Sequence, residues 1–196
     1  MRASQKPISG RGHYIKPEFF NRNTQNTPTS GKHPLEAAAR LLAAGVEAHF
    51  CIVGAPLFGE TDYEASLHQQ AASLGLTSSL GMTAAIEFLG FQADVPAVLR
   101  DLDISVHASI IPEPFGQVII EGIAAGLPVV AAEDGGVQEI IASGQTGLLV
   151  PRADPEAPAG AVAGLIADPT AARRLAAASQ AHVRQQFTIV QTAGRL

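Results

Sequence analysis

Cysteine and charged residues are scarce in this sequence, and each scarcity excludes a class of protein. Cys51 is the single cysteine, so no disulfide can form within the chain. Charged residues make up 16% of the chain and the net charge is -5, which leaves no basic field for a nucleic acid. We therefore expect neither a disulfide-stapled protein nor a nucleic-acid-binding one.

Long apolar runs are missing as well. The runs at residues 104–111 and 127–132 fall far short of the ~20 apolar residues that span a bilayer. The sequence also shows no charged start followed by an apolar stretch that would resemble a signal peptide. The sequence therefore predicts no transmembrane segment and a cytoplasmic location.

Apolar residues, at 46% of 196, are abundant enough for one domain with a substantial core. Residues 1–34 are polar and carry no strand or helix period, so we expect a poorly ordered arm or linker there. In residues 35–196, Ala- and Leu-rich helical segments alternate with short β-branched runs, which predicts βαβ units. The expected fold class is α/β, a Rossmann-like parallel sheet flanked by helices.

The expected elements follow this alternation. The strands are nearly all continuous apolar runs, at Ala48–Val53, Ile86–Leu89, Ile104–Ala108, Pro128–Ala132 and Gly147–Val150. The helices are expected at Leu35–Ala44, Asp62–Leu74, Val95–Leu102, Gly116–Ala125, Val137–Ala142, Pro155–Ala167 and Thr170–Gln186. Ligands of such sheets bind beyond the carboxyl ends of the strands, so the loops after the strands should hold the site.

The segment PEPFGQVIIEGIAAG, residues 112–126, places Glu113 and Glu121 in an otherwise apolar stretch. Pro114 disfavours helical geometry at Glu113, so we expect Glu113 in a loop and Glu121 inside the following helix. Because the eight residue steps from Glu113 to Glu121 would extend about 12 Å along a helix, a carboxylate pair that shares a proton is a poor explanation.

A helix N-terminus lies between the two glutamates in this prediction. Its free N–H groups, at residues 115–118, carry partial positive charge and suit a phosphate. This order matches the groups of a sugar nucleotide. One carboxylate would bind the sugar hydroxyls, the helix end would bind the diphosphate, and the second carboxylate would bind the ribose hydroxyls. On spacing alone, a loop acid and a solvent-facing helix acid remain the alternative.

Residues 113–150 closely resemble the donor-binding half of retaining glycosyltransferases of family 4 (glycosyl transferases group 1), which have the two-domain GT-B fold. Besides Glu113 and Glu121, the shared motifs are Gly-Leu-Pro-Val-Val at 126–130, Gly-Gly-Val-Gln-Glu at 135–139 and Gly-Leu-Leu-Val at 147–150. FCIVGAP and IEFLGFQADVPAVL upstream are similar to the family as well, so the resemblance covers about residues 35–190.

The resemblance implies a function in glycan biosynthesis and a role for each matching residue. Glu113 would hold the donor sugar hydroxyls and act as the catalytic residue, and Glu121 would bind the ribose of a nucleotide-diphosphate sugar. The other donor contacts implied are Phe115, Gly116, Gln117, Val118, Gly90, Phe91, Gly135 and Gly136. It also implies transfer with retention of configuration and without a metal cofactor.

Two parts of the family pattern are hard to find. The family's Arg and Lys on the diphosphate have no clear counterpart; Lys32 is the candidate cation, and Arg11 fits less well. The acceptor-binding half, which precedes this domain in the family, has no match in residues 1–34. We therefore expect a truncated or split enzyme, inactive alone, whose missing half binds a glycan, lipid or small-molecule acceptor and allows peripheral membrane contact.

Two other hypotheses stay open: an inactive sugar-nucleotide-binding remnant, or a subunit that a separate chain completes. An epimerase or phosphorylase relative fits less well, because a phosphorylase needs a cofactor lysine and residues 104–153 contain none.

The six histidines show no metal-ligand spacing, so no metal site is expected. For His107, which precedes the Glu113 loop, we favour a strand-end histidine with satisfied hydrogen bonds over one that faces the site.

Overall fold

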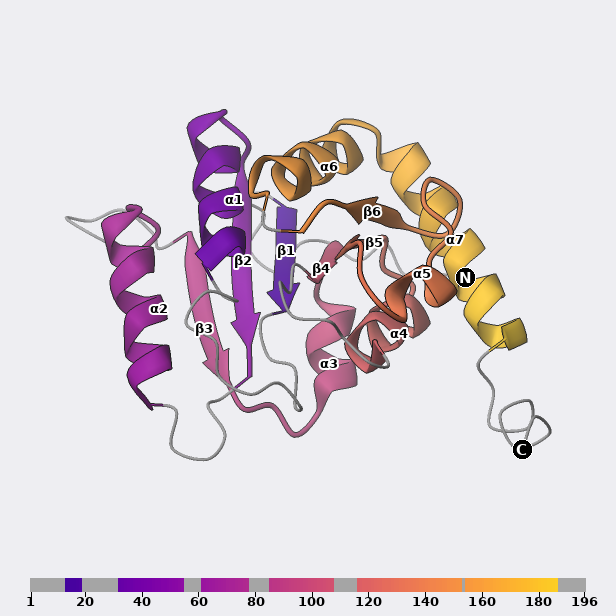
Figure 1. Cartoon of the computed structure of the whole chain (residues 1–196), viewed down its shortest axis with the longest axis horizontal. Helices are drawn as coiled ribbons and strands as arrows, with labels where there is room; N and C mark the ends of the chain where they lie inside the picture. The colour runs from indigo at the N-terminus through magenta and orange to yellow at the C-terminus, as the bar shows by residue number, and fades with distance from the viewer. Residues whose placement is uncertain are drawn as a thin grey trace.

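The chain folds around one parallel β-sheet with helices on both faces (Figure 1). The computed structural model describes residues 13–18, 32–54, 61–77, 85–107, 116–152 and 154–186. The strands are β1 His13–Glu18, β2 Ala48–Val53, β3 Ile86–Gly90, β4 Ile104–His107, β5 Val129–Ala132 and β6 Leu148–Val150. The helices are α1 Lys32–Ala43, α2 Thr61–Ser73, α3 Val95–Arg100, α4 Gln117–Ala124, α5 Val137–Ile140, α6 Glu156–Ala167 and α7 Pro169–Gln186.

The strand order is β3-β2-β1-β4-β5-β6, and every neighbouring pair is parallel. The carboxyl ends of all six strands therefore lie at one edge of the sheet. The direction of winding reverses between β1 and β4, where Glu18 pairs in register with His107. In open sheets of this order, the crevice outside this reversal point is where ligands bind.

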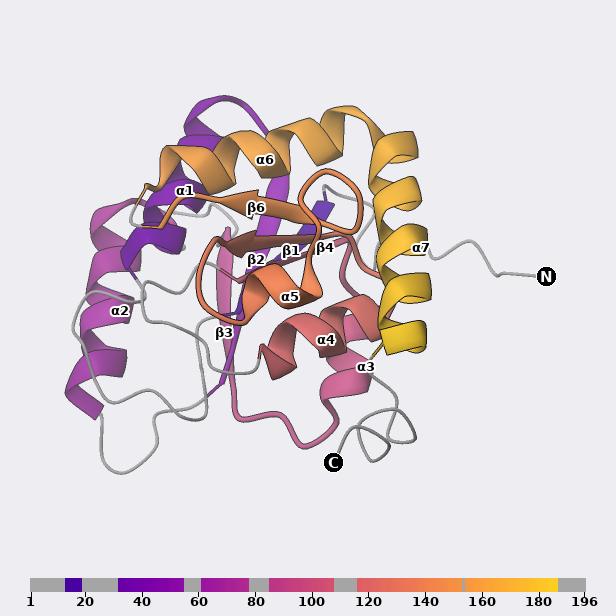
Figure 2. The same cartoon turned by 45° about the vertical axis from the view of Figure 1, so that its right-hand side comes forward.

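Two apolar clusters cover the two faces of the sheet. The larger cluster packs α1, α2 and α6 against side chains such as Phe50, Ile104 and Val106. The smaller one packs α4 and α5 against Val129 and Ala131. Figure 2 shows α6 and α1 on one side of the sheet and α4 on the other, with α7 alongside both layers. This arrangement confirms the expected parallel sheet that is buried on both faces.

Strand β1 corrects the prediction for the first 34 residues. We expect no strand there, yet His13–Glu18 pairs with both β2 and β4 in the middle of the sheet. The sequence HYIKPE is neither a continuous apolar run nor free of proline, and Pro17 lacks the N–H that a central strand donates. Pairing with β2 and β4, rather than local strand propensity, therefore makes this segment a strand.

The other elements agree closely with the prediction. Strand β2 has the predicted bounds, and the remaining strands differ at their ends by one residue. Helix α1 begins at Lys32 rather than Leu35, which is sterically allowed because Pro34 then falls in the first helical turn. Helix α3 starts after Asp94, whose carboxylate accepts a hydrogen bond from the Ala97 N–H at 2.9 Å.

Candidate functional site at the carboxyl edge of the sheet

Gly116 sets the start of helix α4, the helix that carries the predicted phosphate site. Its φ of +63° is left-handed, a conformation that glycine adopts without steric cost. The position is also closed in space, because a Cβ atom here would lie 2.7 Å from the Ile140 Cδ1 atom. Ile140 belongs to α5, so Gly116 lets the start of α4 approach the helix that follows the Gly135–Gly136 turn.

The first turn of α4 presents hydrogen-bond donors at the carboxyl edge. Helix formation leaves the N–H groups of residues 116–119 without a carbonyl partner inside the helix. With Gly116 as the N-cap residue, this set lies one residue further along the chain than predicted. The helix dipole adds partial positive charge at this end, so the first turn suits an anion.

Glu121 and Gln117 form a pair on one face of α4. The Gln117 Nε2–H donates to Glu121 Oε1 at 3.1 Å, which fixes the carboxylate along the helix. A carboxylate can accept about four hydrogen bonds, so Glu121 keeps acceptor sites for further hydroxyl groups. The structure therefore gives the Gln117 side chain a role that sequence reasoning did not assign, although the i, i+4 spacing predicts such a contact.

The turn after β5 contains Gly135 and Gly136 and leads into α5. The Val137 N–H donates to the Asp134 carbonyl at 3.0 Å, and Gly135 has a φ of +44°. Arg152, just after β6, donates its Nη1–H to Asp134 Oδ2 at 2.8 Å. This ion pair ties the turn to the end of the neighbouring strand. Sequence reasoning missed it, although both residues follow strands that end at the same edge.

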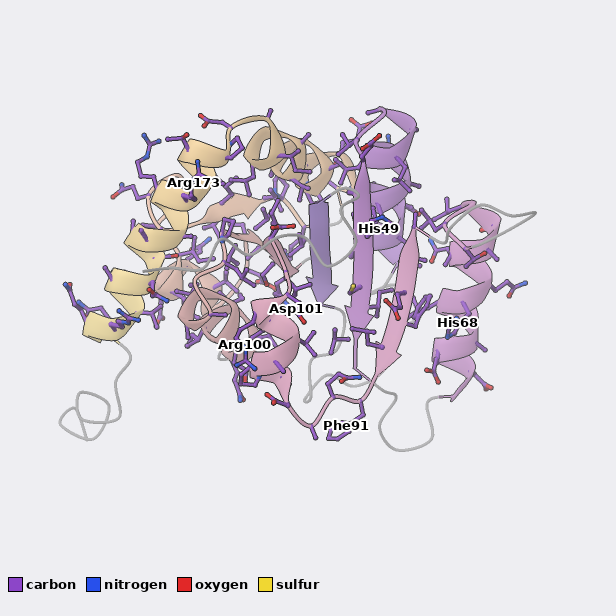
Figure 3. The ribbon with its side chains drawn as sticks, turned by 180° about the vertical axis from the view of Figure 1, so that it is seen from behind. His49, His68, Phe91, Arg100, Asp101 and Arg173 are labelled. Atoms are coloured by element: carbon purple, nitrogen blue, oxygen red, sulfur yellow. The ribbon has the colours of Figure 1, made fainter. Side chains whose placement is uncertain are left out.

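Gly90 and Phe91 lie at the end of β3, on the far side of the reversal point. Gly90 has a φ of +62°, and 70% of the Phe91 surface is exposed. Figure 3 shows Phe91 beyond the carboxyl end of the sheet, whereas Arg173 of α7 lies at the opposite end. Three strand spacings, about 14 Å, separate β3 from β4, so any molecule that touches both Phe91 and α4 must be extended.

His107, the last residue of β4, is 4% exposed. Within the part of the chain that the structure describes, neither of its ring nitrogens has a hydrogen-bond partner. Burial lowers the pKa of His107 from 6.5 to about 4, because desolvation disfavours the charged imidazolium. The prediction of a strand-end histidine with satisfied hydrogen bonds is therefore wrong, since no described donor or acceptor reaches its ring.

Several predicted site residues lie outside the described residues. Glu113 and Phe115 fall in the segment 108–115, and Arg11 precedes β1. The structure describes the backbone of Lys32, which is the first residue of α1 at the carboxyl edge of the sheet, but not its side chain. The structure thus brings Gly116 against Ile140 of α5, the helix that follows the Gly135–Gly136 turn, and pairs Gln117 with Glu121 on α4. The binding roles of all these residues stay predictions.

The described residues contain no group of three or more His, Cys, Asp or Glu side chains that could hold a metal ion. None of the helices within these described ranges is long and apolar enough to cross a membrane. The arrangement has a helix N-terminus, a carboxylate with free acceptor sites and an exposed aromatic ring along one edge. Chemically it can bind an anion and hydroxyl groups.

Comparison with known proteins identifies relatives of this arrangement. The family model described as glycosyl transferases group 1 matches residues 32–182. D-inositol 3-phosphate glycosyltransferase of Rhodococcus erythropolis is 35% identical over 167 residues, which are 83% of this chain and 36% of that protein. This chain thus spans little more than a third of that relative's length.

Solved structures of similar proteins share the fold. The Anabaena protein HepE, crystallised with UDP and glucose, is 33% identical with a TM-score of 0.80, over 94% of this chain and 47% of HepE. The C-terminal domain of a glycosyl transferase group 1 family protein, LpcC from Francisella tularensis, is 26% identical with a TM-score of 0.73, over 91% of this chain and 87% of that one. With a family match over most of its length and an α/β fold that matches GT-B glycosyltransferase structures, the chain belongs to the glycosyl transferases group 1 family.

Proposed function

We propose that this chain is the donor-binding half of a retaining glycosyltransferase of family 4 and that it binds a nucleotide-diphosphate sugar. One observation carries the proposal: Gly116, the N-cap residue of α4, lies against Ile140 of α5, the helix that follows the Gly135–Gly136 turn, and Glu121 lies further along α4. This edge offers donors for a diphosphate and acceptors for hydroxyl groups. HepE, a similar structure, was crystallised with UDP and glucose.

The proposed ligand lies along the edge from β3 to α5. The base borders Gly90 and Phe91, the ribose hydroxyls donate to Glu121, and the diphosphate accepts hydrogen bonds from the first turn of α4. Gly135 and Gly136 allow the sugar or a phosphate to approach the backbone. In this proposal Glu113 and Phe115 hold the donor sugar, and Lys32 supplies a cation to the diphosphate.

The proposed chemistry is electrostatic. As the glycosidic bond breaks, negative charge develops on the departing diphosphate, and N–H groups that already point at it stabilise that charge. The helix end takes the part that a metal ion plays elsewhere, so we propose transfer without a metal cofactor. Front-face attack, in which the leaving phosphate takes the proton of the acceptor hydroxyl, gives retention of configuration without a protein nucleophile.

Turnover requires an acceptor site, which we propose lies in a separate half. This chain covers 47% of HepE but 87% of the LpcC C-terminal domain, which supports its equivalence to one half of a two-domain enzyme. The alternative proposal is an inactive sugar-nucleotide-binding remnant, or a subunit completed by another chain. Donor binding is common to both proposals, so binding is the first property to test.

The test measures binding of UDP, GDP and ADP to the 196-residue chain by calorimetry, and then compares the best ligand with its 2′,3′-dideoxy analogue. We expect Glu121→Ala to weaken the ordinary nucleotide about 10- to 100-fold, because a hydrogen bond to a charged group contributes about 1.5–3 kcal/mol. The dideoxy analogue should bind Glu121→Ala and the unmodified chain alike.

Glu87→Ala is the matched control, because Glu87 is an exposed carboxylate on β3. This variant should bind the nucleotide like the unmodified chain. Absence of binding by all three nucleoside diphosphates would contradict the proposed function. An equal loss for the ordinary and dideoxy nucleotides in Glu121→Ala would contradict only the ribose contact.

A further inference from the structure

His107 is a buried polar residue, and none of the residues that the structure describes forms a hydrogen bond with its ring. An unpaired polar group in a protein interior costs about 1–3 kcal/mol, so such groups are rare without a functional reason. The proposed donor site described above does not use this side chain. The position of His107 in the sheet indicates which ligand group could form a hydrogen bond with its ring.

The strand register places His107 at the reversal point of the sheet. It is the last residue of β4 and pairs with Glu18 of β1 on one side and Ala131 of β5 on the other. The crevice outside the carboxyl ends of these two central strands, β1 and β4, is the ligand position of open α/β sheets. His107 is thus the carboxyl-terminal residue of the β4 strand at that crevice.

Packing of α4 shows which face of the sheet His107 occupies. Side chains alternate along a strand, so His107 shares its face with Ser105. A Cβ atom on Gly122 of α4 would lie 2.9 Å from the Ser105 Oγ atom, so this is the face that α4 covers. The Ala131 partner of His107 also belongs to the cluster beneath α4.

The level of His107 along α4 follows from the same contact. Two strand residues advance about 6.6 Å, which corresponds to about four residues of helix. Because β4 and α4 run in opposite directions, the helix residue level with His107 lies about four residues before Gly122, at Val118. Val118 is in the first turn of α4, where the N–H groups are free.

We propose that the His107 imidazole is a further phosphate-binding residue, which donates a ring N–H to a phosphoryl oxygen of the nucleotide at the N-terminus of α4. The inference rests on the proposed function and adds to it a side chain that supplements the backbone donors. A phosphate only accepts hydrogen bonds, and a neutral imidazole always has one N–H to donate. Burial keeps the free imidazole neutral at pH 7, since it lowers the pKa of His107 to about 4.

The experiment measures the affinity of the 196-residue chain for UDP and for uridine, with GDP or ADP and their nucleosides as substitutes where those bind better. His107→Leu should weaken the nucleoside diphosphate about 10-fold, the effect of one lost hydrogen bond of about 1.4 kcal/mol, and leave the nucleoside unchanged. His107→Asn or His107→Gln should restore most of the loss, because an amide NH₂ can donate in place of one of the two ring nitrogens.

His68→Leu is the matched control, since His68 is an exposed histidine on α2 that stacks on Phe88 with ring centroids 3.9 Å apart. It should bind both ligands like the unmodified chain. A second measurement does not depend on how well a variant folds. In the unmodified chain, the imidazole ¹⁵N signals of His107 should shift when the nucleoside diphosphate is added and stay in place when the nucleoside is added.

The outcomes separate this inference from the proposed function. If no nucleoside diphosphate binds the unmodified chain, both fail. If the nucleotide binds and His107→Leu binds it equally well, or loses nucleotide and nucleoside affinity in parallel, only the inference is overturned. A variant that weakens UDP-glucose and leaves UDP unchanged would place His107 on the sugar and would also overturn it.

Discussion

At the scale of single residues, Gly116 combines two constraints that mutation can separate. A side chain here meets both the left-handed backbone and the Ile140 Cδ1 atom at 2.7 Å. We expect Gly116→Ala to lower the free energy of unfolding by about 2–4 kcal/mol, the sum of a backbone cost and an overpacking cost. Urea denaturation measures this change.

Gly144 provides the matched control for Gly116. Its φ of +76° is similar, but a Cβ atom there would have no neighbour within 4 Å. Gly144→Ala should therefore cost only the backbone term, about 1–2 kcal/mol. Equal losses in the two variants would show that the contact between α4 and α5 does not constrain Gly116.

His107 also predicts a pH dependence of stability. Its pKa is about 4 in the folded chain and 6.5 in the unfolded chain, so only the unfolded chain binds a proton between these values. Protonation of His107 in the unfolded chain therefore lowers the free energy of unfolding as the pH falls from 6.5 to 4, and has no effect on it above pH 6.5. The loss amounts to about 3 kcal/mol. The glutamine side chain of the His107→Gln variant does not titrate. Between pH 7 and pH 4, the unfolding free energy of this variant should therefore fall by about 3 kcal/mol less than that of the unmodified chain. Parallel pH profiles would contradict the assignment.

Sequence reasoning reached some of these residues and not others. The Glu121 position and the helix start near Gly116 follow from a local pattern of proline, glycine and helical period. The unpaired ring of His107 does not, because its surroundings come from β1, β5 and α4, which are distant in sequence or follow a loop. Local patterns therefore locate the helix end, whereas the missing hydrogen-bond partners of His107 among the described residues are seen only in the tertiary packing.

At the scale of elements, close packing of α4 on β4 positions the proposed phosphate site. Gly122 of α4 faces Ser105, whose Oγ and Cβ atoms would lie 2.9 and 3.2 Å from an added Cβ. We expect Gly122→Ala to cost about 1–3 kcal/mol of unfolding free energy, because the helix must move away from the sheet. In a Ser105→Gly background the same substitution should cost at least about 1 kcal/mol less.

Gly164 of α6 is the control for this helix, because a Cβ atom there would have no neighbour within 4 Å. Gly164→Ala should raise the unfolding free energy by up to about 1 kcal/mol, since alanine favours the helix. Additive effects of Gly122→Ala and Ser105→Gly would show that the two residues do not contact each other across the interface.

The strand β1 marks the limit of prediction at this scale. Continuous apolar runs predict the other five strands within one residue at each end, because a parallel sheet buries both of their faces. HYIKPE has no such run, and its place between β2 and β4 depends on partners that supply the pairing. The reversal point between β1 and β4 therefore needs the tertiary structure, although the helix end at Gly116 follows from the local sequence.

At the scale of the whole molecule, donor binding should stabilise the entire domain, because the proposed ligand contacts elements on both sides of the reversal point. A ligand that binds only the folded chain adds about 2.7 kcal/mol at 100 times its Kd. For a domain of this size each kcal/mol raises the melting temperature by about 2–4 °C, so the best nucleoside diphosphate should raise it by about 5–10 °C. Differential scanning calorimetry at increasing ligand concentration measures the shift.

The same calorimetric scan tests whether the ligand contacts one side or both sides of the reversal point between β1 and β4. Phe91 follows β3 and Glu121 lies on α4, which packs on β4, and these two strands are about 14 Å apart. Phe91→Ala and Glu121→Ala therefore remove proposed contacts on opposite sides of the reversal point. If one extended ligand bridges them, each variant should reduce the shift produced by the nucleoside diphosphate. Inorganic pyrophosphate serves as a second ligand in this comparison. Phe91→Ala should leave any rise in melting temperature produced by pyrophosphate unchanged, because pyrophosphate lacks a base. A nucleotide shift that survives Phe91→Ala undiminished would place the base elsewhere and would restrict the proposed site to the α4 side of the reversal point.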